Sequence, residues 1–171
     1  MTRGPTPATA TPRADLLAAA AVFVRAARSL DGVLRIAFVG SILTPKPVPK
    51  DVDLLVTIAD DIGLAPLARL GRQLQGRAQS FNLGADIFLC DRTPRYLGRI
   101  CAHRVCHYRA RCAALHCGAR QHLNDDLGVL TLADDLLRQP PLVVWPYIET
   151  SVALPPDVAA MVAHGGALAF A

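Results

Sequence analysis

Aromatic side chains are scarce in this chain. Phe, Trp and Tyr make up 5% of the 171 residues although 52% of the residues are hydrophobic, and Ala and Leu supply most of that hydrophobic fraction. We therefore expect a core of small aliphatic side chains and abundant helices, since Ala and Leu are strong helix formers. The length favours one domain, or one domain with an appendage.

Long apolar runs and a regular cysteine framework are also missing. No run approaches the ~20 residues of a membrane-spanning helix. Residues 16–24 are apolar, but Arg25 and Arg28 follow them instead of a signal-peptide cleavage site, so we expect an amphipathic helix there. The five cysteines are an odd number and lack the spacing of a secreted disulfide scaffold. Reduced thiols fit the cytosol, and we expect a cytoplasmic protein with no membrane partner.

Lysine is nearly absent from the basic residues. Lys occurs only at positions 46 and 50, and Arg supplies the rest of the 18 basic residues of a chain with net charge +4. Arginine forks suit phosphate groups. The sequence leaves two interpretations open, a solvated basic surface and a contiguous groove for nucleic acid.

The pattern along the chain predicts an α+β fold. Residues 1–13 are rich in Pro, Thr and Ala and are predicted to be disordered. We expect helices over 14–30 and 62–78, and strands over 33–40, 51–59 and 85–90. Residues 94–117 have a helical pattern, residues 124–138 mix strand and helix signals, and 139–146 predict an edge strand or a packing arm. This order of elements favours an α+β or mixed sheet.

Two aspartates open the second predicted strand. Strand side chains alternate between faces, so Asp51 and Asp53 share a face and repel each other. A hard cation such as Mg²⁺ resolves that conflict, and it commonly binds a few carboxylates together with nucleotide phosphates. The preceding strand ends at Gly40 and Ser41. Glycine there lets the backbone approach a phosphate closely, and the serine offers a hydroxyl and an N–H group.

This stretch resembles the signature of the polymerase-beta-type nucleotidyltransferase superfamily. The pattern is an apolar residue, Gly, Gly or Ser, a loop, and then Asp-apolar-Asp-apolar. The matching residues are Val39, Gly40, Ser41, Asp51, Val52, Asp53 and Leu54. The resemblance covers roughly residues 14–90. It implies the nucleotidyltransferase fold of a minimal, single-domain member, with a small mixed β-sheet flanked by helices.

The resemblance also implies a chemistry. Members transfer a nucleoside monophosphate from an NTP such as ATP to an acceptor, with Mg²⁺ (or Mn²⁺), and they carry a third carboxylate on a later strand. Asp86 lies in the matching place, and Asp91, just beyond that strand, is the second choice. Asp51, Asp53 and Asp86 are thus the expected catalytic and metal-binding residues. In the alternative interpretation these residues have structural roles only. Gly40 and Ser41 form a turn, Asp51 ends the loop, and Asp86 is a buried, hydrogen-bonded acid.

The segments around the motif are assigned as follows. Gly40 and Ser41, with Lys46 and Lys50 of the proline-rich loop, are the expected nucleotide-binding residues, although the two lysines fit a solvated loop equally well. We expect a nucleotidyltransferase core over 14–92. Residues 93–171 are expected to form a helical or irregular extension that packs on this core and serves acceptor recognition or homodimer contacts.

The acceptor class stays open at this level. Small members of the superfamily include antitoxins that modify a partner toxin, antibiotic-modifying enzymes and RNA-modifying enzymes, so the acceptor hydroxyl belongs to a protein, an RNA or a small molecule. The competing hypothesis is a non-catalytic binding module of the same fold that holds a protein or RNA partner.

Cysteine and histidine crowd residues 101–122. On a helix, His103 and His107 would lie one turn apart, as would Cys112 and His116. No pair has the Cys-x₂-Cys spacing of a zinc ribbon, so we expect small core cysteines rather than a zinc site.

Overall fold

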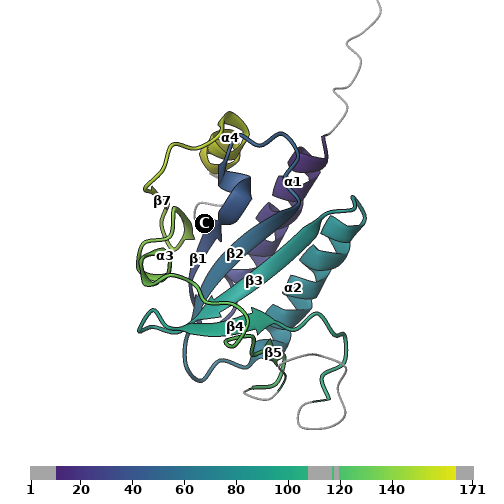
Figure 1. The fold of residues 1–171 in the computed structure, drawn as a ribbon, viewed down its shortest axis with the longest axis vertical. Coiled ribbons are helices and arrows are strands. Elements are labelled where there is room, and N and C mark those ends of the chain that lie inside the picture. Colours follow the sequence, from purple (N-terminus) through teal and green to yellow (C-terminus); the bar gives the residue numbers. More distant parts are fainter. Residues whose placement is uncertain (1–10, 108–116, 118–119, 165–171) are drawn as a thin grey trace, which may run out of the picture.

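The computed structural model describes residues 11–107, 117 and 120–164. In these ranges the chain is α+β, with four α-helices, one short 3₁₀ helix and a seven-stranded mixed sheet (Figure 1). The helices are α1 (Pro12–Ala27), α2 (Leu64–Gln79), α3 (Asp134–Arg138), α4 (Pro156–His164) and the 3₁₀ helix η1 (Gly40–Leu43). The strands are β1 (Val33–Val39), β2 (Asp51–Ile58), β3 (Gly84–Cys90), β4 (Tyr96–Ile100), β5 (Leu123–Asn124), β6 (Leu142–Trp145) and β7 (Glu149–Thr150).

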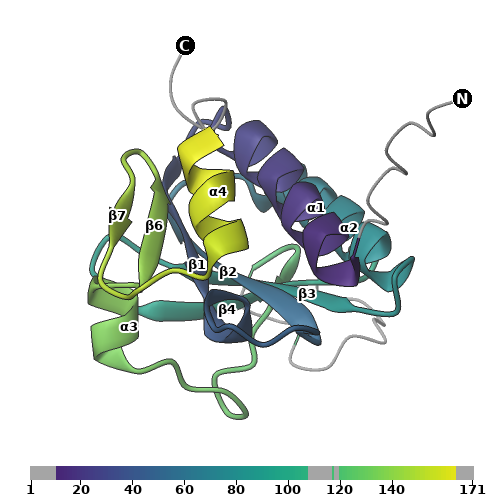
Figure 2. The ribbon, with the colours of Figure 1, turned by 90° about the horizontal axis from the view of Figure 1, so that it is seen from above.

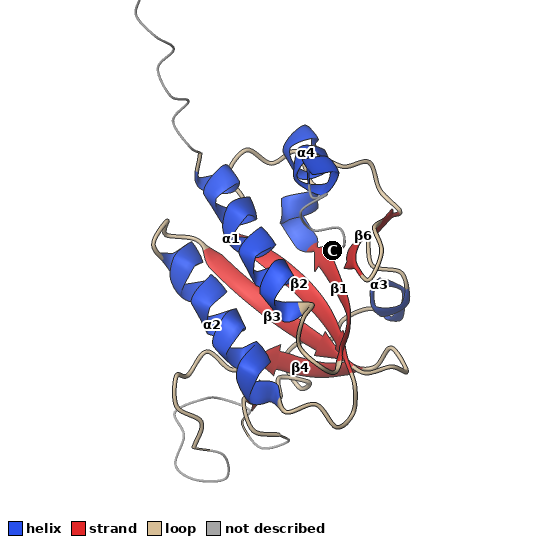
Figure 3. Ribbon diagram, turned by 180° about the vertical axis from the view of Figure 1, so that it is seen from behind, coloured by secondary structure: helices blue, strands red, loops and turns tan. Residues whose placement is uncertain are grey.

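The sheet separates two layers. Its strand order is β5-β4-β3-β2-β1-β6-β7; β2 and β3 run parallel, and the other neighbours run antiparallel. Helices α1 and α2 lie side by side on one face (Figure 3), and α4 lies next to α1 (Figure 2). The short helix α3 covers part of the opposite face, where its residue Leu137 packs among residues of the central strands.

Alternation along the strands produces this two-sided packing. Val52, Leu54 and Val56 of β2 point into the large core beneath the helices. Leu55, between them, joins a smaller cluster with Phe88 and Leu137 on the opposite face. Each central strand is therefore apolar on both faces over part of its length, as expected of a parallel pair covered on both sides.

Three of the predicted strands and two of the predicted helices are confirmed. The predicted strands 33–40, 51–59 and 85–90 correspond to β1, β2 and β3, and the predicted helices 14–30 and 62–78 correspond to α1 and α2. The prediction that residues 1–13 are disordered is wrong for the last two of them, because α1 begins at Pro12. The hydroxyl of Thr11 caps that helix by accepting a hydrogen bond from the Ala14 N–H, at 3.2 Å. Residues 1–10 lie outside the described ranges.

The helix predicted over 94–117 is wrong in its described part. Residues 96–100 form β4, in which buried and half-buried side chains alternate with a period of two, and residues 101–107 are not helical. Pairing with β3 on one side and β5 on the other decides this structure, because it satisfies the backbone polar groups of the segment. Residues 108–116 lie outside the described ranges.

The helical or irregular C-terminal extension is also corrected. Residues 93–171 contribute β4, β5, β6 and β7 to the same sheet as the motif strands. Strand β6 lies within the predicted 139–146 segment. It pairs with β1 on one side and with the short β7 on the other, so it is an inner strand and not an edge strand. The motif strands are therefore inner strands of a sheet completed by the second half of the chain. Within the described residues, no helix combines the length and apolar character needed to cross a membrane.

A buried arginine ties the two ends of the described chain together. Arg13, only 7% exposed, forms an ion pair with Asp157 at the start of α4. It also donates hydrogen bonds to the carbonyl oxygens of Ile42, at 2.8 Å, and Lys46, at 3.0 Å. The same guanidinium thus fixes α1, α4 and the loop that follows η1.

We predict that Arg13→Met destabilises the protein. The substitution leaves the Ile42 carbonyl without its donor, and losing charged hydrogen bonds costs about 2 kcal/mol or more, or roughly 4–8 °C in Tm for a chain of this size. Hydrogen bonds and the charge of Arg13 lower the pKa of Asp157. That part of the stability is present near neutral pH and is lost as the pH falls below the ordinary aspartate value, so the difference in Tm between wild type and variant should shrink there.

Thermal unfolding followed by circular dichroism measures this difference. Arg25→Met is the matched control, because Arg25 lies on the same helix but is exposed. Equal Tm values for Arg13→Met and Arg25→Met would contradict the anchoring role.

Candidate functional site

The pairing of β2 with β3 brings the three predicted aspartates to neighbouring positions. In the parallel register Asp53 lies opposite Asp86, and Asp51 lies opposite Gly84. Asp51 and Asp53 alternate with the buried Val52, and Asp86 alternates with the buried Ala85 and Ile87. All three carboxylates therefore lie on the sheet face opposite α1 and α2, at the end where both strands begin.

Gly40 packs against one of these carboxylates. Val39, the last residue of β1, pairs with Asp53, and Gly40 follows it with φ +74°. A Cβ atom at Gly40 would overlap Oδ2 of Asp53. A side chain is therefore excluded here by the backbone conformation and by the close approach of the carboxylate.

Ser41 follows Gly40 in η1. It is half-buried, and its carbonyl oxygen accepts hydrogen bonds from the Thr44 N–H, at 3.1 Å, and the Thr44 hydroxyl, at 2.7 Å. These bonds close the turn that leads from β1 into the proline-rich loop. The predicted Gly40-Ser41 pair thus begins η1 directly after β1, and Gly40 is the member that contacts the carboxylate cluster.

Like charges crowd Asp53. Burial raises the pKa of Asp53 to about 7, with further increases from the negative charges of Asp51 and Asp86, while Arg99 acts in the opposite direction. The ionised form of this carboxyl group is thus disfavoured in the folded protein. A bound cation would remove that disadvantage.

Arg99 is the residue that our sequence analysis missed. Its guanidinium contacts Oδ1 of Asp86 at 3.2 Å through one nitrogen and donates to Oδ2 of Asp126 at 2.6 Å through another. The Tyr96 hydroxyl donates to the other oxygen of Asp126 at 2.8 Å, and Asp126 is 1% exposed. Burial would lower the pKa of Arg99, but the two carboxylates outweigh it and raise that pKa, so Arg99 is charged. No local pattern links positions 86, 99 and 126; only the pairing of β3 with β4 and the return of the chain after β5 bring them together.

Asp91, the second choice for the third carboxylate, has a structural role. It lies beyond the far end of β3, away from Asp51. Burial raises the pKa of Asp91, but hydrogen bonds from Thr93, at 2.9 and 2.7 Å, and from Arg95 outweigh it and lower that pKa. Asp91 closes the turn between β3 and β4.

The two lysines of the proline-rich loop are exposed. In the described chain neither Lys46 nor Lys50 forms an ion pair, and the Lys46 carbonyl accepts a hydrogen bond from Arg13. Lys50 immediately precedes β2 and is therefore next to Asp51 in the chain. Their ammonium groups are free to meet an anion from solvent.

The donor set suits a hard cation. Asp51, Asp53 and Asp86 supply carboxylate oxygens, the ligands that Mg²⁺ and Mn²⁺ prefer. Among the described residues, no three His, Cys, Asp or Glu side chains already surround a single point closely enough to hold a metal ion. Binding one through all three carboxylates would require Asp86 to leave Arg99, with which it is paired.

The cysteine and histidine segment is not the helix that its spacing predicted. His103 and His107 are exposed on a non-helical stretch, Cys101 is buried, and Sγ of Cys106 accepts a hydrogen bond from the His122 N–H at 3.3 Å. The helical proximity expected for His103 and His107 is therefore wrong. Cys112 and His116 lie outside the described residues.

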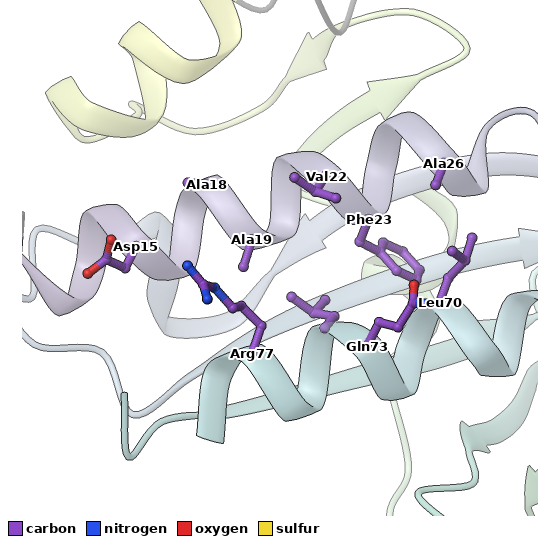
Figure 4. Close-up of a pocket in the computed structure, with 10 residues that line it drawn as sticks. Asp15, Ala18, Ala19, Val22, Phe23, Ala26, Leu70, Gln73 and Arg77 are labelled. Carbon is purple, nitrogen blue, oxygen red and sulfur yellow. The ribbon is translucent and has the colours of Figure 1, made fainter. Parts of the chain in front are cut away.

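An apolar groove between α1 and α2 does not belong to this site. It has a volume of about 360 Å³ and is lined mainly by small and aliphatic residues, with Asp15 and Arg77 toward one end (Figure 4). It lies on the helical side of the sheet, whereas the three carboxylates face the other side. The groove carries none of the candidate nucleotide-binding residues.

We predict that Asp53→Asn raises the Tm of the metal-free protein near neutral and alkaline pH. Because the folded state holds the Asp53 proton up to about pH 7, whereas an unfolded aspartate loses it near 3.8, this residue makes the wild type less stable as the pH rises through that interval. The amide has no charge, so the advantage of the variant should be small at about pH 4 and reach a few degrees at about pH 8.

The measurement is the difference in Tm between variant and wild type, in buffer with a chelator, across this pH range. Asp60→Asn serves as the control, since Asp60 is exposed and precedes α2. A pH-independent difference for Asp53→Asn, equal to that of the control, would contradict the crowded-carboxylate description.

Similarity to known proteins adds nothing to this geometry. Comparisons of the chain with protein-family models, with curated proteins and with solved structures found no match. The α+β architecture and the carboxylate cluster are thus established by the structure of this chain, and its function has to be argued from them.

Proposed function

We propose that this protein is a metal-dependent nucleotidyltransferase of the polymerase-beta type, which transfers a nucleoside monophosphate from an NTP to an acceptor hydroxyl. One observation carries the proposal: Asp53 lies opposite Asp86 on parallel strands, Asp51 shares their face, and the Gly40 backbone packs on Asp53. These residues are the ones expected from the sequence motif. Because the three carboxylates lie on one face of the sheet, they support a single cation-binding site.

The charge of the cluster supports a divalent cation as cofactor. The three carboxylates have a single arginine, Arg99, to balance their charge, and Arg99 is already shared with Asp126. The pKa of Asp53 is raised to about 7. Mg²⁺ or Mn²⁺ would be held by Asp51, Asp53 and Asp86. When bound, the cation supplies Lewis-acid stabilisation of the charge on the phosphates of the nucleotide.

The remaining residues of the motif would bind the nucleotide. Gly40 lacks a side chain where the Asp53 carboxylate fills that space, so its backbone lies directly against the group that would hold the cation. Lys46 and Lys50 are exposed on the loop between η1 and β2 and would balance the charge of the triphosphate. Asp86 is the candidate to orient and deprotonate the acceptor hydroxyl, since Asp51 and Asp53 come from one strand and suffice for a first cation.

The Arg99 ion pair supports a second candidate function. Arg99 neutralises Asp86 at 3.2 Å, and a permanently paired Asp86 would be a poor base or metal ligand. In that case the same architecture would act as a non-catalytic module that holds a protein or RNA partner. The two functions differ in whether Asp86 leaves Arg99 when nucleotide and metal bind.

We predict that the protein binds NTP only in the presence of Mg²⁺ or Mn²⁺. Asp51→Asn and Asp53→Asn should each weaken this binding at least tenfold, because each removes a charged cation ligand, a loss of about 1.4 kcal/mol or more. Isothermal titration calorimetry with ATP and the other NTPs, with and without the metal, measures it. Asp60→Asn is the control for a surface aspartate, and unchanged metal–nucleotide affinity in both site variants would remove the site hypothesis.

Asp86→Asn separates binding from chemistry. If Asp86 serves the acceptor hydroxyl, the variant should keep most of its nucleotide affinity and lose transfer by roughly a hundredfold or more, as for the loss of a general base. Transfer is measured as incorporation of label from α-labelled NTPs in a lysate of the source organism. Melting temperature is measured in parallel, because Asp86 also pairs with Arg99.

Arg99→Gln is the companion variant. It frees Asp86, and the catalytic proposal predicts that it retains cation-dependent nucleotide binding. A folded Asp86→Asn variant with normal transfer would exclude the catalytic role, and absence of transfer by the wild type with every NTP would favour the binding module.

A further inference from the structure

A basic groove lies on the helical side of the molecule, away from the three carboxylates. It has a volume of about 790 Å³ and runs along α2, between this helix and the residues that follow β4 and precede β5. Its lining includes three arginines, Arg69, Arg72 and Arg104, together with His122. Among the described residues that line it, there is no aspartate or glutamate to offset these charges.

The helical period of α2 generates one wall of this basic groove. Residues 65, 69, 72, 76 and 79 follow each other at intervals of three or four, so they form one stripe along the helix. The opposite stripe, which includes Leu67 and Leu74, is buried in the core. A helix of this length extends ~24 Å, which matches about seven nucleotides of a stacked strand at 3.4 Å each.

The arginines of the groove are available to a ligand. Arg69 and Arg104 are exposed, and neither forms an ion pair within the described residues. Arg72 is half-buried, and its side chain donates a 3.4 Å hydrogen bond to the carbonyl oxygen of Cys101, which directs the guanidinium toward the groove side of α2. Burial, together with the charge of Arg72, lowers the pKa of His122, consistent with a positive potential in the groove.

The uncharged lining indicates what kind of anion fits. Gln73, Gln75 and Gln79 lie along the groove, and their amides both donate and accept hydrogen bonds, as sugar hydroxyls and base edges require. The described lining contains no Phe, Trp or Tyr. Base stacking on aromatic side chains is therefore not offered by this lining, and a strand would be held through its phosphates, sugars and base edges.

We propose that the basic groove along α2 binds single-stranded nucleic acid through its phosphodiester backbone, with Arg69, Arg72 and Arg104 contacting phosphates and the glutamines contacting sugars and base edges. The groove is separated from the carboxylates by the sheet, so it is not the nucleotide site. The arginine contacts to phosphate, which supply most of the affinity, are independent of base sequence. The proposal does not depend on catalysis at the carboxylates.

The test uses the full chain and fluorescein-labelled RNA and DNA oligonucleotides of about 12 nucleotides, a length within the usual range of single-strand sites. Binding is followed by fluorescence anisotropy between about 50 and 200 mM salt. Arg69→Gln/Arg72→Gln/Arg104→Gln should bind at least tenfold more weakly at the lowest salt. It should also lose about 2 from the slope of log affinity against log salt, since each contact to a single strand contributes about 0.7.

The matched control is Arg25→Gln/Arg92→Gln/Arg138→Gln, which changes the net charge equally at exposed positions outside the groove. It should bind within about twofold of wild type. Arg69→Gln/Arg104→Gln spares the Arg72 hydrogen bond and should lose about 1.4 from the slope, so a folding defect in the triple variant does not decide the result. Binding of RNA, DNA or both with this groove dependence supports the proposal and identifies the strand.

Three results would overturn the proposal. They are no binding by the wild type below about 100 μM, an equal loss in the control variant, and equally tight, groove-dependent binding of a poly-aspartate peptide. Asp53→Asn, which tests the carboxylate site, should leave oligonucleotide binding unchanged. Failure of the nucleotidyltransferase proposal and failure of the groove proposal are therefore distinguishable.

Discussion

The in-register parallel pairing of β2 with β3 is the constraint on which the rest of this structure depends. Side chains of both strands alternate, so one register puts Val52 and Leu54 beneath α1 and α2 and turns Asp53 and Asp86 to the other side. A slip by one residue would bury the carboxylates under the helices and expose the apolar set. The free energy of burying the core therefore holds the carboxylates together, even though they repel each other.

Arg99 neutralises only part of the negative charge at the site. One guanidinium serves Asp86 and the nearly fully buried Asp126, while Asp51 and Asp53 share the same face. Asp126 has two donors, Arg99 and Tyr96, and is satisfied without further help. Asp51 and Asp53 are half-buried and form no ion pair within the described residues, so their charge is left for a cation to neutralise. Whether Asp86 stays paired with Arg99 therefore distinguishes a structural role of Asp86 from a catalytic one.

The two candidate sites carry opposite charge. The carboxylate cluster lies on the face partly covered by α3, and the basic groove lies along α2 on the other face. A polyanion attracted to the groove is kept from the carboxylates by a layer of apolar side chains, and a cation attracted to the carboxylates is kept from the arginines. If both proposals hold, this separation would let a nucleotide–metal complex and a nucleic acid strand bind at once without sharing ligands.

Local pattern in the sequence determined two helices and three strands in the first half of the fold, and predicted the three aspartates that the sheet brings to one face. The period of β2 predicted that Asp51 and Asp53 share a face, and the apolar neighbours of Asp86 predicted its strand, because these depend only on residues adjacent in the chain. Tertiary structure decided the rest. The segment around Tyr96 and Arg99 looked helical by composition and became β4, because β3 offered an unpaired edge whose backbone groups it satisfied. The Arg99 bridge from Asp86 to Asp126, and the basic groove between α2 and residues after β4, join positions tens of residues apart. Contacts of that kind leave no periodic trace in a single sequence, since packing rather than local propensity brings their partners together.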